Sequence, residues 1–271
     1  MEAIWSVAIY LIIFFYGLFI GSFLNVVIFR VPKKESLSKE RSHCMSCGYQ
    51  LRWFDLFPLF SWLFLGGKCR KCKEPISAQY PIVEAANGFL YVFLFVAAYG
   101  LNAYEVFEYF RLETLLYCFM GSALLALSVI DFRTYEIPVG FNIFIGALGV
   151  INLIYRFIAF GVEGSDWQTY IIGLFAVSLV TLIIYLASGG RAIGGGDVKL
   201  MAAAGLLIGW KLIVLAFLLG CILGSVIHII RMKVSKADHM LAMGPYLSAG
   251  IMLAVFFGEP LINWYLGLFA L

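Results

Sequence analysis

In "TYIIGLFAVSLVTLIIYLASGGRAIGGGDVKLMAAAGLLIG" (residues 169–209), two apolar runs flank a turn that is rich in glycine. The first run, 169–187, contains no charged residue and approaches the roughly 20 residues that span a bilayer. Three consecutive glycines then precede Asp197, and an apolar run resumes at Leu200. Such flanks do not suit a soluble surface, so the sequence places a carboxylate on a glycine turn at a membrane.

The rest of the chain has the same apolar character. Of its 271 residues, 63% are hydrophobic and only 13% are charged, and the mean hydropathy is +0.95. A soluble domain carries about 25% charged residues, so most of this chain should lie in lipid. Because lipid offers the backbone no hydrogen bonds, the apolar segments should be helices. We predict an all-α polytopic membrane protein with about eight transmembrane helices, at 4–29, 82–101, 112–130, 139–160, 169–187, 200–210, 212–230 and 244–268.

The basic residues predict how these helices are oriented. No positively charged region precedes the first helix, so it reads as a permanent span and not as a cleaved signal peptide. With both termini outside, 16 of the 19 basic residues fall in loops on the cytoplasmic side. Those loops are 30–80, 131–138, 188–199 and 231–243. The net charge of +3 is then explained by orientation, and no nucleic-acid partner is needed.

The one long polar stretch, residues 30–80, contains two Cys-x2-Cys pairs separated by 21 residues, Cys44 with Cys47 and Cys69 with Cys72. Two such pairs can present four thiolates to a structural zinc ion, with no position left open for catalysis. Two separate redox motifs are the alternative interpretation. A single zinc site explains both pairs at once, and structural disulfides are rare in the cytoplasm, where the predicted orientation puts this loop.

Between the cysteine pairs lies "LRWFDLFPLFSWLFLGG" (51–67), which is unusually apolar for a loop. Its aromatic side chains suit an amphipathic piece that rests on the membrane face. They equally suit a small core around the zinc ion, and the sequence leaves both interpretations open.

Ionisable residues in or beside membrane helices are functional candidates, because burying them is costly. The candidates here are Glu84, Asp131, Glu136, Asp197 and Lys199. Asp131 and Asp197 are distant in sequence, yet the predicted orientation brings both to the cytoplasmic ends of their segments. Two neighbouring carboxylates share a proton, so one acts as an acid and the other as a base, as in aspartic peptidases.

The glycines before Asp197 suit this chemistry, because glycine allows close approach and unusual backbone conformations. We expect "GGGD" to form an unwound segment beside which an extended peptide can lie. A plain inter-helix turn with an exposed aspartate is the alternative for this short pattern. Asp131, as a second carboxylate on the same side, favours the peptidase.

Taken together, the motifs resemble those of the bacterial type IV prepilin peptidases, the GxGD-type membrane aspartic peptidases. The similarity runs through "GLFIGSFLNVVIFRVP" (17–32), "GKCRKCKEPISAQYPIVEAANG" (67–88), "SVIDFRTYEIP" (128–138), "GGGDVKL" (194–200) and "GPYLSAG" (244–250). It implies a first transmembrane helix at 1–29, a zinc loop at 30–80 and a peptidase domain at 81–271. It also implies removal of the leader of prepilins or pseudopilins by Asp131 and Asp197, in the bacterial inner membrane.

The resemblance further implies methylation of the new N-terminus with S-adenosylmethionine, although the sequence contains no glycine-rich methyltransferase fingerprint. Glu84 and Gly88 are the candidate contacts for this cofactor, and Glu84 equally suits a structural pairing with a basic side chain. Two other classes of protein stay open: an ion-coupled transporter with buried carboxylates, and a membrane scaffold that docks partners through its zinc module.

Overall fold

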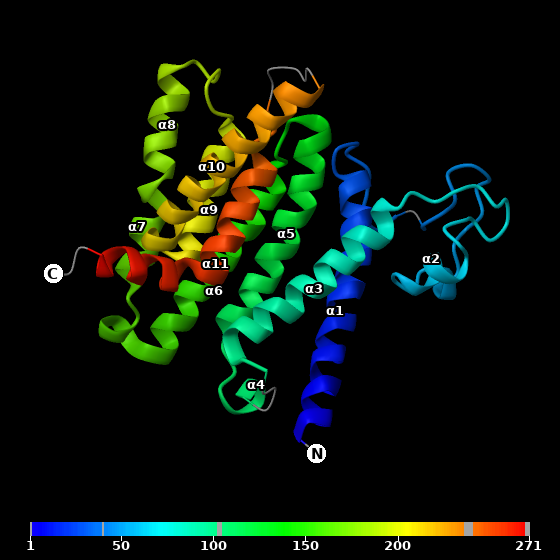
Figure 1. Cartoon of the computed structure of the whole chain (residues 1–271), viewed down its shortest axis with the longest axis horizontal. Helices are drawn as coiled ribbons and strands as arrows, with labels where there is room; N and C mark the ends of the chain where they lie inside the picture. Colours follow the sequence, from blue (N-terminus) through cyan, green and yellow to red (C-terminus); the bar gives the residue numbers. More distant parts are fainter. Residues whose placement is uncertain (1, 40, 102–104, 236–240, 269–271) are drawn as a thin grey trace. The chain divides into compact units, whose positions relative to one another are not determined.

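The computed structural model describes residues 2–39, 41–101, 105–235 and 241–268, so part of the predicted loop 231–243 lies outside it. Within these ranges the regular structure is helical, and the only strand-like pairings are two isolated bridges in the insert. Figure 1 labels most of the elements: α1 Glu2–Arg30, 3-10 helix η1 Trp53–Asp55, α2 Phe60–Phe64, α3 Gln79–Tyr99, α4 Glu105–Glu108, α5 Leu112–Thr134, α6 Val139–Gly164, α7 Trp167–Ala176, α8 Ser178–Ala187, α9 Gly195–Ile208, α10 Trp210–Ser235 and α11 Gly244–Gly267.

Seven helices in the described ranges are long and apolar enough to cross a membrane, with α7 and α8 together forming one span, Trp167–Ala187. These seven match seven of the predicted segments. The eighth segment, 200–210, falls on α9, whose 14 residues measure only about 21 Å. The prediction of an all-α polytopic membrane protein is confirmed.

Helix α9 is short because protein, and not lipid, surrounds much of it. It begins beside Tyr185, and its C-cap Gly209 lies against Thr169, so α9 runs back along the length of α7 and α8. A Cβ on Gly173 of α7 would collide with the carbonyl of Gly205, which shows how closely these helices approach. The fully buried face of α9 includes Leu200, Met201, Ala204 and Leu207.

The chain forms two compact units, Met1–Ala126 and Leu127–Leu271, and α5 continues from one into the other. In the first unit α1 packs along α3 (Figure 1). A Cβ on Gly17 would lie 2.8 Å from the Gly88 Cα, and one on Gly21 would lie 2.7 Å from the Glu84 Cα. Larger side chains at these two positions of α1 would therefore push the helices apart.

A buried polar network ties α5 to this pair of helices. The Asn87 amide donates to the Gly17 carbonyl at 2.8 Å, and the Ser122 hydroxyl donates to Asn87 Oδ1, also at 2.8 Å. Tyr91 OH lies 3.0 Å from the Ser122 hydroxyl. Because an unpaired polar group in lipid is costly, this network fixes the register of the three helices.

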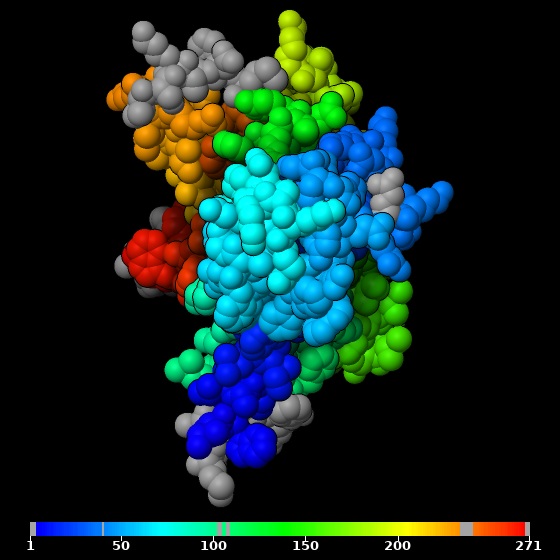
Figure 2. All heavy atoms as spheres, turned by 90° about the vertical axis from the view of Figure 1, so that its right-hand side faces the viewer, coloured from blue at the N-terminus to red at the C-terminus, as the bar shows by residue number. Residues whose placement is uncertain are grey.

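In the second unit, α9 packs against both α6 and α7, and α10 packs against α11. Helix α6 runs parallel to α9, since the Cβ position of Gly149 is filled by Leu206 and the Asn142 amide reaches the Gly196 carbonyl. The beginnings of α6 and α9 therefore lie at the same end of the unit. Figure 2 shows the insert of the first unit, residues 31–78, as the light-blue to cyan surface that faces the viewer.

Candidate active site and metal centre

The glycine turn ends at the first turn of α9. Gly194 is the N-cap residue and has an extended backbone, with φ −72° and ψ 140°, and the helix begins at Gly195. The unwound backbone expected for "GGGD" is thus confined to Gly194 and the turn before it. A Cβ on Gly196 would lie 3.0 Å from the Ile137 Cβ, so glycine is needed here for close packing and not for an irregular conformation.

Asp131 is buried near the C-terminal end of α5, with 4% of its surface exposed. Its Oδ2 atom accepts a hydrogen bond of 2.8 Å from the Gly244 N–H, in the first turn of α11. A Cβ on Gly244 would lie 2.7 Å from that same oxygen. Any side chain at this position would displace the carboxylate, so the contact depends on glycine.

Asp197 lies in the first turn of α9, outside the seven membrane-spanning segments, and is partly buried. Burial raises its pKa to about 6, and the neighbouring Asp131 carboxylate contributes to the rise. The two predicted aspartates therefore come together in one unit, at the ends of α5 and α9. Two neighbouring carboxylates can share one proton, which would provide an acid and a base at the same place.

Two further residues at this site were not assigned a role from the sequence. One is Gly244: its motif could be recognised in the sequence, but the hydrogen bond from its N–H to Asp131 forms only because α11 packs beside α5. The other is Asn142, which is 6% exposed and whose Oδ1 has no partner within the described part of the chain. Its amide lies 3.4 Å from the Gly196 carbonyl, next to Asp197. Glu136 and Lys199, two other sequence candidates, are exposed.

The predicted cysteines come together in the insert. The four Sγ atoms of Cys44, Cys47, Cys69 and Cys72 all lie within 4.8 Å of one another, and none forms a disulfide. Tetrahedral zinc with Zn–S bonds of about 2.3 Å requires sulfur atoms about 3.8 Å apart. The Cys44 and Cys72 sulfurs are 3.8 Å apart, so this cluster has the dimensions of a metal site.

Two turns of matching geometry present these thiols. In the first, the Cys44 N–H donates to the Tyr49 carbonyl and the Gly48 N–H donates back to Cys44. In the second, Cys69 makes the same pair of bonds with Glu74 and Lys73. The residue after each pair is left-handed: Gly48 has φ 67° and Lys73 has φ 62°. The backbone amides of Cys47 and Ser46 lower the pKa of Cys44 to about 6, which favours the thiolate that a metal binds.

The two residues predicted to contact S-adenosylmethionine are both buried in α3. The Glu84 carboxylate accepts a hydrogen bond of 2.6 Å from the Leu59 N–H, a main-chain donor in the insert and not the basic side chain considered from the sequence. Gly88 faces Phe14, whose ring would lie 2.8 Å from a Cβ there. Helix packing therefore accounts for the glycine at 88 without a ligand.

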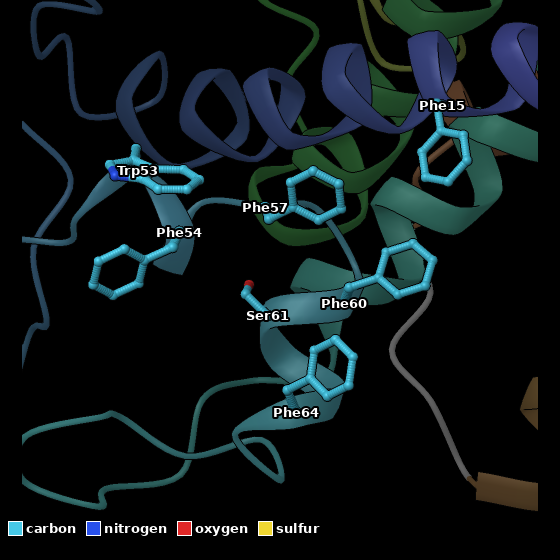
Figure 3. A pocket seen from close by; sticks show the side chains of 7 residues that line it. All are labelled: Phe15, Trp53, Phe54, Phe57, Phe60, Ser61 and Phe64. Carbon is cyan, nitrogen blue, oxygen red and sulfur yellow. The ribbon is translucent and has the colours of Figure 1, made fainter.

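The sequence left open whether the aromatic side chains of the insert form its core or lie on the membrane face. Some of them pack inside the insert and others do not. Trp62 packs inside the insert, where its indole N–H donates to the Ile76 carbonyl at 3.1 Å. Phe57 and Phe60 instead turn towards α1 and, with Phe15, line an open cavity of about 370 Å³ (Figure 3). The other lining residues are Trp53, Phe54, Ser61 and Phe64.

Both units of the chain match models of known protein families. Residues 15–98 match the bacterial peptidase A24 N-terminal domain, and residues 118–229 match the type IV leader peptidase family. The matched ranges contain all four clustered cysteines and both aspartates.

Proteins with the name prepilin leader peptidase/N-methyltransferase are similar over almost the whole chain. The one from Stutzerimonas stutzeri is 31% identical, covering 92% of this chain and 91% of that protein. Those from Aeromonas hydrophila and Pseudomonas aeruginosa are each 30% identical, covering 94% and 92% of this chain and 93% and 91% of theirs. No solved structure matches the chain at a significant level.

Proposed function

Because the chain belongs to the type IV leader peptidase family, we propose that it removes the leader of type IV prepilins or pseudopilins with Asp131 and Asp197 as an aspartic pair. The observation that carries this proposal is the placement of both aspartates in one unit, where the loop after α5 packs on the start of α9 through Ile137 and Gly196 and the Asp131 charge contributes to the raised pKa of Asp197. A transporter could also use buried carboxylates, but the relatives of this chain bear the name of a peptidase.

Asp131 is the ionised member of the pair in this proposal. The Gly244 N–H donates to its Oδ2 atom, and that amide stands at the N-terminus of a 24-residue helix. Both features stabilise a negative charge. Asp131 takes a proton from a water molecule, and the water oxygen then attacks the carbonyl carbon of the scissile peptide bond.

Asp197 is the protonated member. It donates its proton to the carbonyl oxygen as the tetrahedral intermediate forms. When the C–N bond breaks, the leaving amine takes the proton held by Asp131, and a hydroxyl proton of the intermediate returns to Asp197. The pair ends in the protonation state in which it began, so the cycle needs no further proton donor or acceptor.

The basic loops support the orientation in this proposal, with both termini outside and with the cysteine cluster and the aspartates facing the cytoplasm. In this arrangement the basic leader stays in the cytoplasm, and the apolar part of the prepilin lies in the bilayer. The loops before α6 and α9 then lie on the cytoplasmic side, where the leader arrives.

Zinc is the metal proposed for the cysteine cluster, because four thiols whose sulfurs all lie within 4.8 Å of one another, with those of Cys44 and Cys72 3.8 Å apart, suit its tetrahedral coordination. A closed site of this kind has a structural role. Bound zinc would hold the two turns together and offset the repulsion between the thiolates.

Methylation of the new N-terminus is proposed from the names of the relatives, with S-adenosylmethionine as the donor. The aromatic cavity of Figure 3 does not fit this cofactor by itself. Ser61 and the Trp53 indole are the only polar side-chain groups among the described residues that line it, so the cofactor's carboxylate and amine lack charged partners there. Glu84 stays a prediction for contact with the donor.

The proposal is tested by the intact mass of a prepilin-like peptide after incubation with the purified protein in lipid and S-adenosylmethionine. Wild type should remove the leader and add one methyl group, and Asp197→Asn should leave the leader in place. A matched control, Glu136→Gln, changes an exposed acid in the loop after Asp131 and should cleave normally. Cleavage by Asp197→Asn at the wild-type rate would remove this residue from the mechanism.

A further inference from the structure

The insert carries an apolar surface that its own fold leaves uncovered. Trp53 is 81% exposed and Phe64 is 87% exposed, and Leu56 and Leu63 are also exposed. These side chains belong to η1, to α2 and to the turn between them, so they form one continuous stretch, 53–64. Contiguous apolar surface of this kind marks a site of interaction with a protein or a membrane.

The same stretch is docked on α1 through aromatic pairs. The ring centroids of Phe57 and Phe19 are 5.8 Å apart, and those of Phe60 and Phe15 are 6.0 Å apart and stacked. Figure 3 shows Phe15 of α1 and Phe60 of the insert turned towards each other across the cavity. The height of segment 53–64 along α1 is therefore fixed by residues of known position in a transmembrane helix.

That height lies inside the bilayer. The apolar span of α1 is Ile4–Arg30, and a hydrocarbon core of about 30 Å takes about 20 of its residues, so the core includes Phe15 and Phe19 wherever it lies within the span. Phe19 is then at least about 6 Å and Phe15 at least about 12 Å inside the boundary on the Arg30 side, at 1.5 Å per residue.

Two hydrogen-bond donors of the segment are satisfied by protein groups. The Leu59 N–H, at a break between η1 and α2, donates to the buried Glu84 carboxylate, and the Trp62 indole donates to Ile76. Irregular backbone is tolerated at membrane depth only where it is buried in protein, as at this contact between the insert and α3. The contact with Glu84 therefore gives this carboxylate a role that requires no cofactor.

We infer that residues 53–64 form a monotopic element that enters the leaflet adjoining Arg30, where Trp53 and Phe64 contact lipid acyl chains. The occupant is lipid because the surface continues the lipid-facing side of α1, on which Tyr16, Phe19 and Phe23 are about half exposed. An apolar element buried about 5–10 Å beyond the headgroups is typical of interfacial helices. The aromatic cavity is then filled by an acyl chain.

Segment 53–64, once embedded in the membrane, would also position the cysteine cluster. The Arg70 guanidinium, between Cys69 and Cys72, donates to the buried Asp55 carboxylate at 2.7 Å and lies 4.8 Å above the Phe54 ring. One turn of the cluster is thus joined directly to the lipid-embedded segment. The element would hold the metal site close to the membrane surface.

The test uses the full chain in nanodiscs of phosphatidylethanolamine and phosphatidylglycerol, with the photoreactive p-benzoylphenylalanine introduced at one position. Phe64→p-benzoylphenylalanine should gain, after irradiation, the mass of one phospholipid, mapped to the peptide that contains position 64. Trp53→p-benzoylphenylalanine should do the same. Both variants keep an aromatic ring at an exposed position, so the fold should tolerate them, and bound metal verifies that it does.

The matched control is Met45→p-benzoylphenylalanine, since Met45 is 78% exposed in the same insert but belongs to the first cysteine turn. It should gain no lipid. Equal lipid labelling at Met45 and Phe64 would contradict a specific depth for segment 53–64. Crosslinks from Phe64 to a second copy of the chain, or to an added prepilin-like peptide in place of lipid, would overturn the choice of occupant.

Discussion

The cysteine cluster and the aspartate pair are assembled in opposite ways. The cluster comes from one insert, where two turns of the same geometry each supply two thiols from residues three apart. The aspartate site takes Asp131 from α5, Asp197 from α9 and an amide from Gly244 of α11, so it exists only when these helices pack. A local site tolerates loosening of the membrane helices, and an assembled site does not.

The largest effect should come from removing either acid of the assembled site. Asp131→Asn should lower kcat for leader cleavage by about 10²–10⁴-fold, the range that general acid–base catalysis contributes. The folded state and bound metal should be retained, because the cysteine cluster is built independently. Cleavage kinetics and metal analysis on the same sample would check this. Loss of metal together with activity would show that the two sites are not built independently.

Displacing Asp131 without removing it should cost somewhat less. In Gly244→Ala the new Cβ would lie 2.7 Å from the Asp131 oxygen and force it to move, and misplacing a reacting group by about 1 Å can cost 10²-fold. We expect kcat to fall with little change in KM. Gly267→Ala, in the same helix with nothing near its Cβ position, should be indistinguishable from wild type.

The pH dependence should reveal the shared proton. Asp197 has a pKa raised to about 6, so it holds its proton below that value and loses it as the pH rises. Cleavage should fall about tenfold per pH unit above the apparent pKa, while the acid stays essential. Because the folded-state pKa is raised above the ordinary value near 4, folding stability should also decline as the pH rises from about 4 to about 6. A flat profile between pH 5 and about 8 would contradict proton sharing.

The local site should show the smallest effect on cleavage. Cys44→Ser should abolish metal binding and open the insert, since such small modules draw much of their folding free energy from the metal. Limited proteolysis should then cut within 31–78, while cleavage of the prepilin-like peptide falls only several-fold. A loss as large as that of Asp131→Asn would show that the two sites are not independent.

The contrast also explains what the sequence could predict. Hydropathy and Cys-x2-Cys spacing are local properties, so seven spans and the composition of the cysteine cluster could be read directly. The role of Gly244 depends on α11 reaching α5, more than a hundred residues away in sequence, and no local pattern reports that contact. The length of α9 could not be predicted from the sequence either, because a helix that is surrounded by protein does not have to be long enough to span the bilayer.

Glycines were the hardest residues to interpret. Gly88 suited a cofactor contact on resemblance, yet it allows α3 to pack against Phe14 of α1. Gly196 suited an unwound segment, yet it belongs to a helix and accommodates Ile137. In both cases a side chain distant in sequence occupies the position where a Cβ would stand, and only the packed structure identifies it.

The central claim, that Asp131 and Asp197 act as one unit, is tested most directly by a double-mutant cycle on leader cleavage. Asp131→Asn, Asp197→Asn and the double variant would be compared with wild type under one set of conditions in lipid. The account predicts that each single change costs nearly as much as both together, because residues that act as a unit are strongly non-additive. Losses in the single variants that multiply in the double variant would contradict a shared proton and show two carboxylates that act independently.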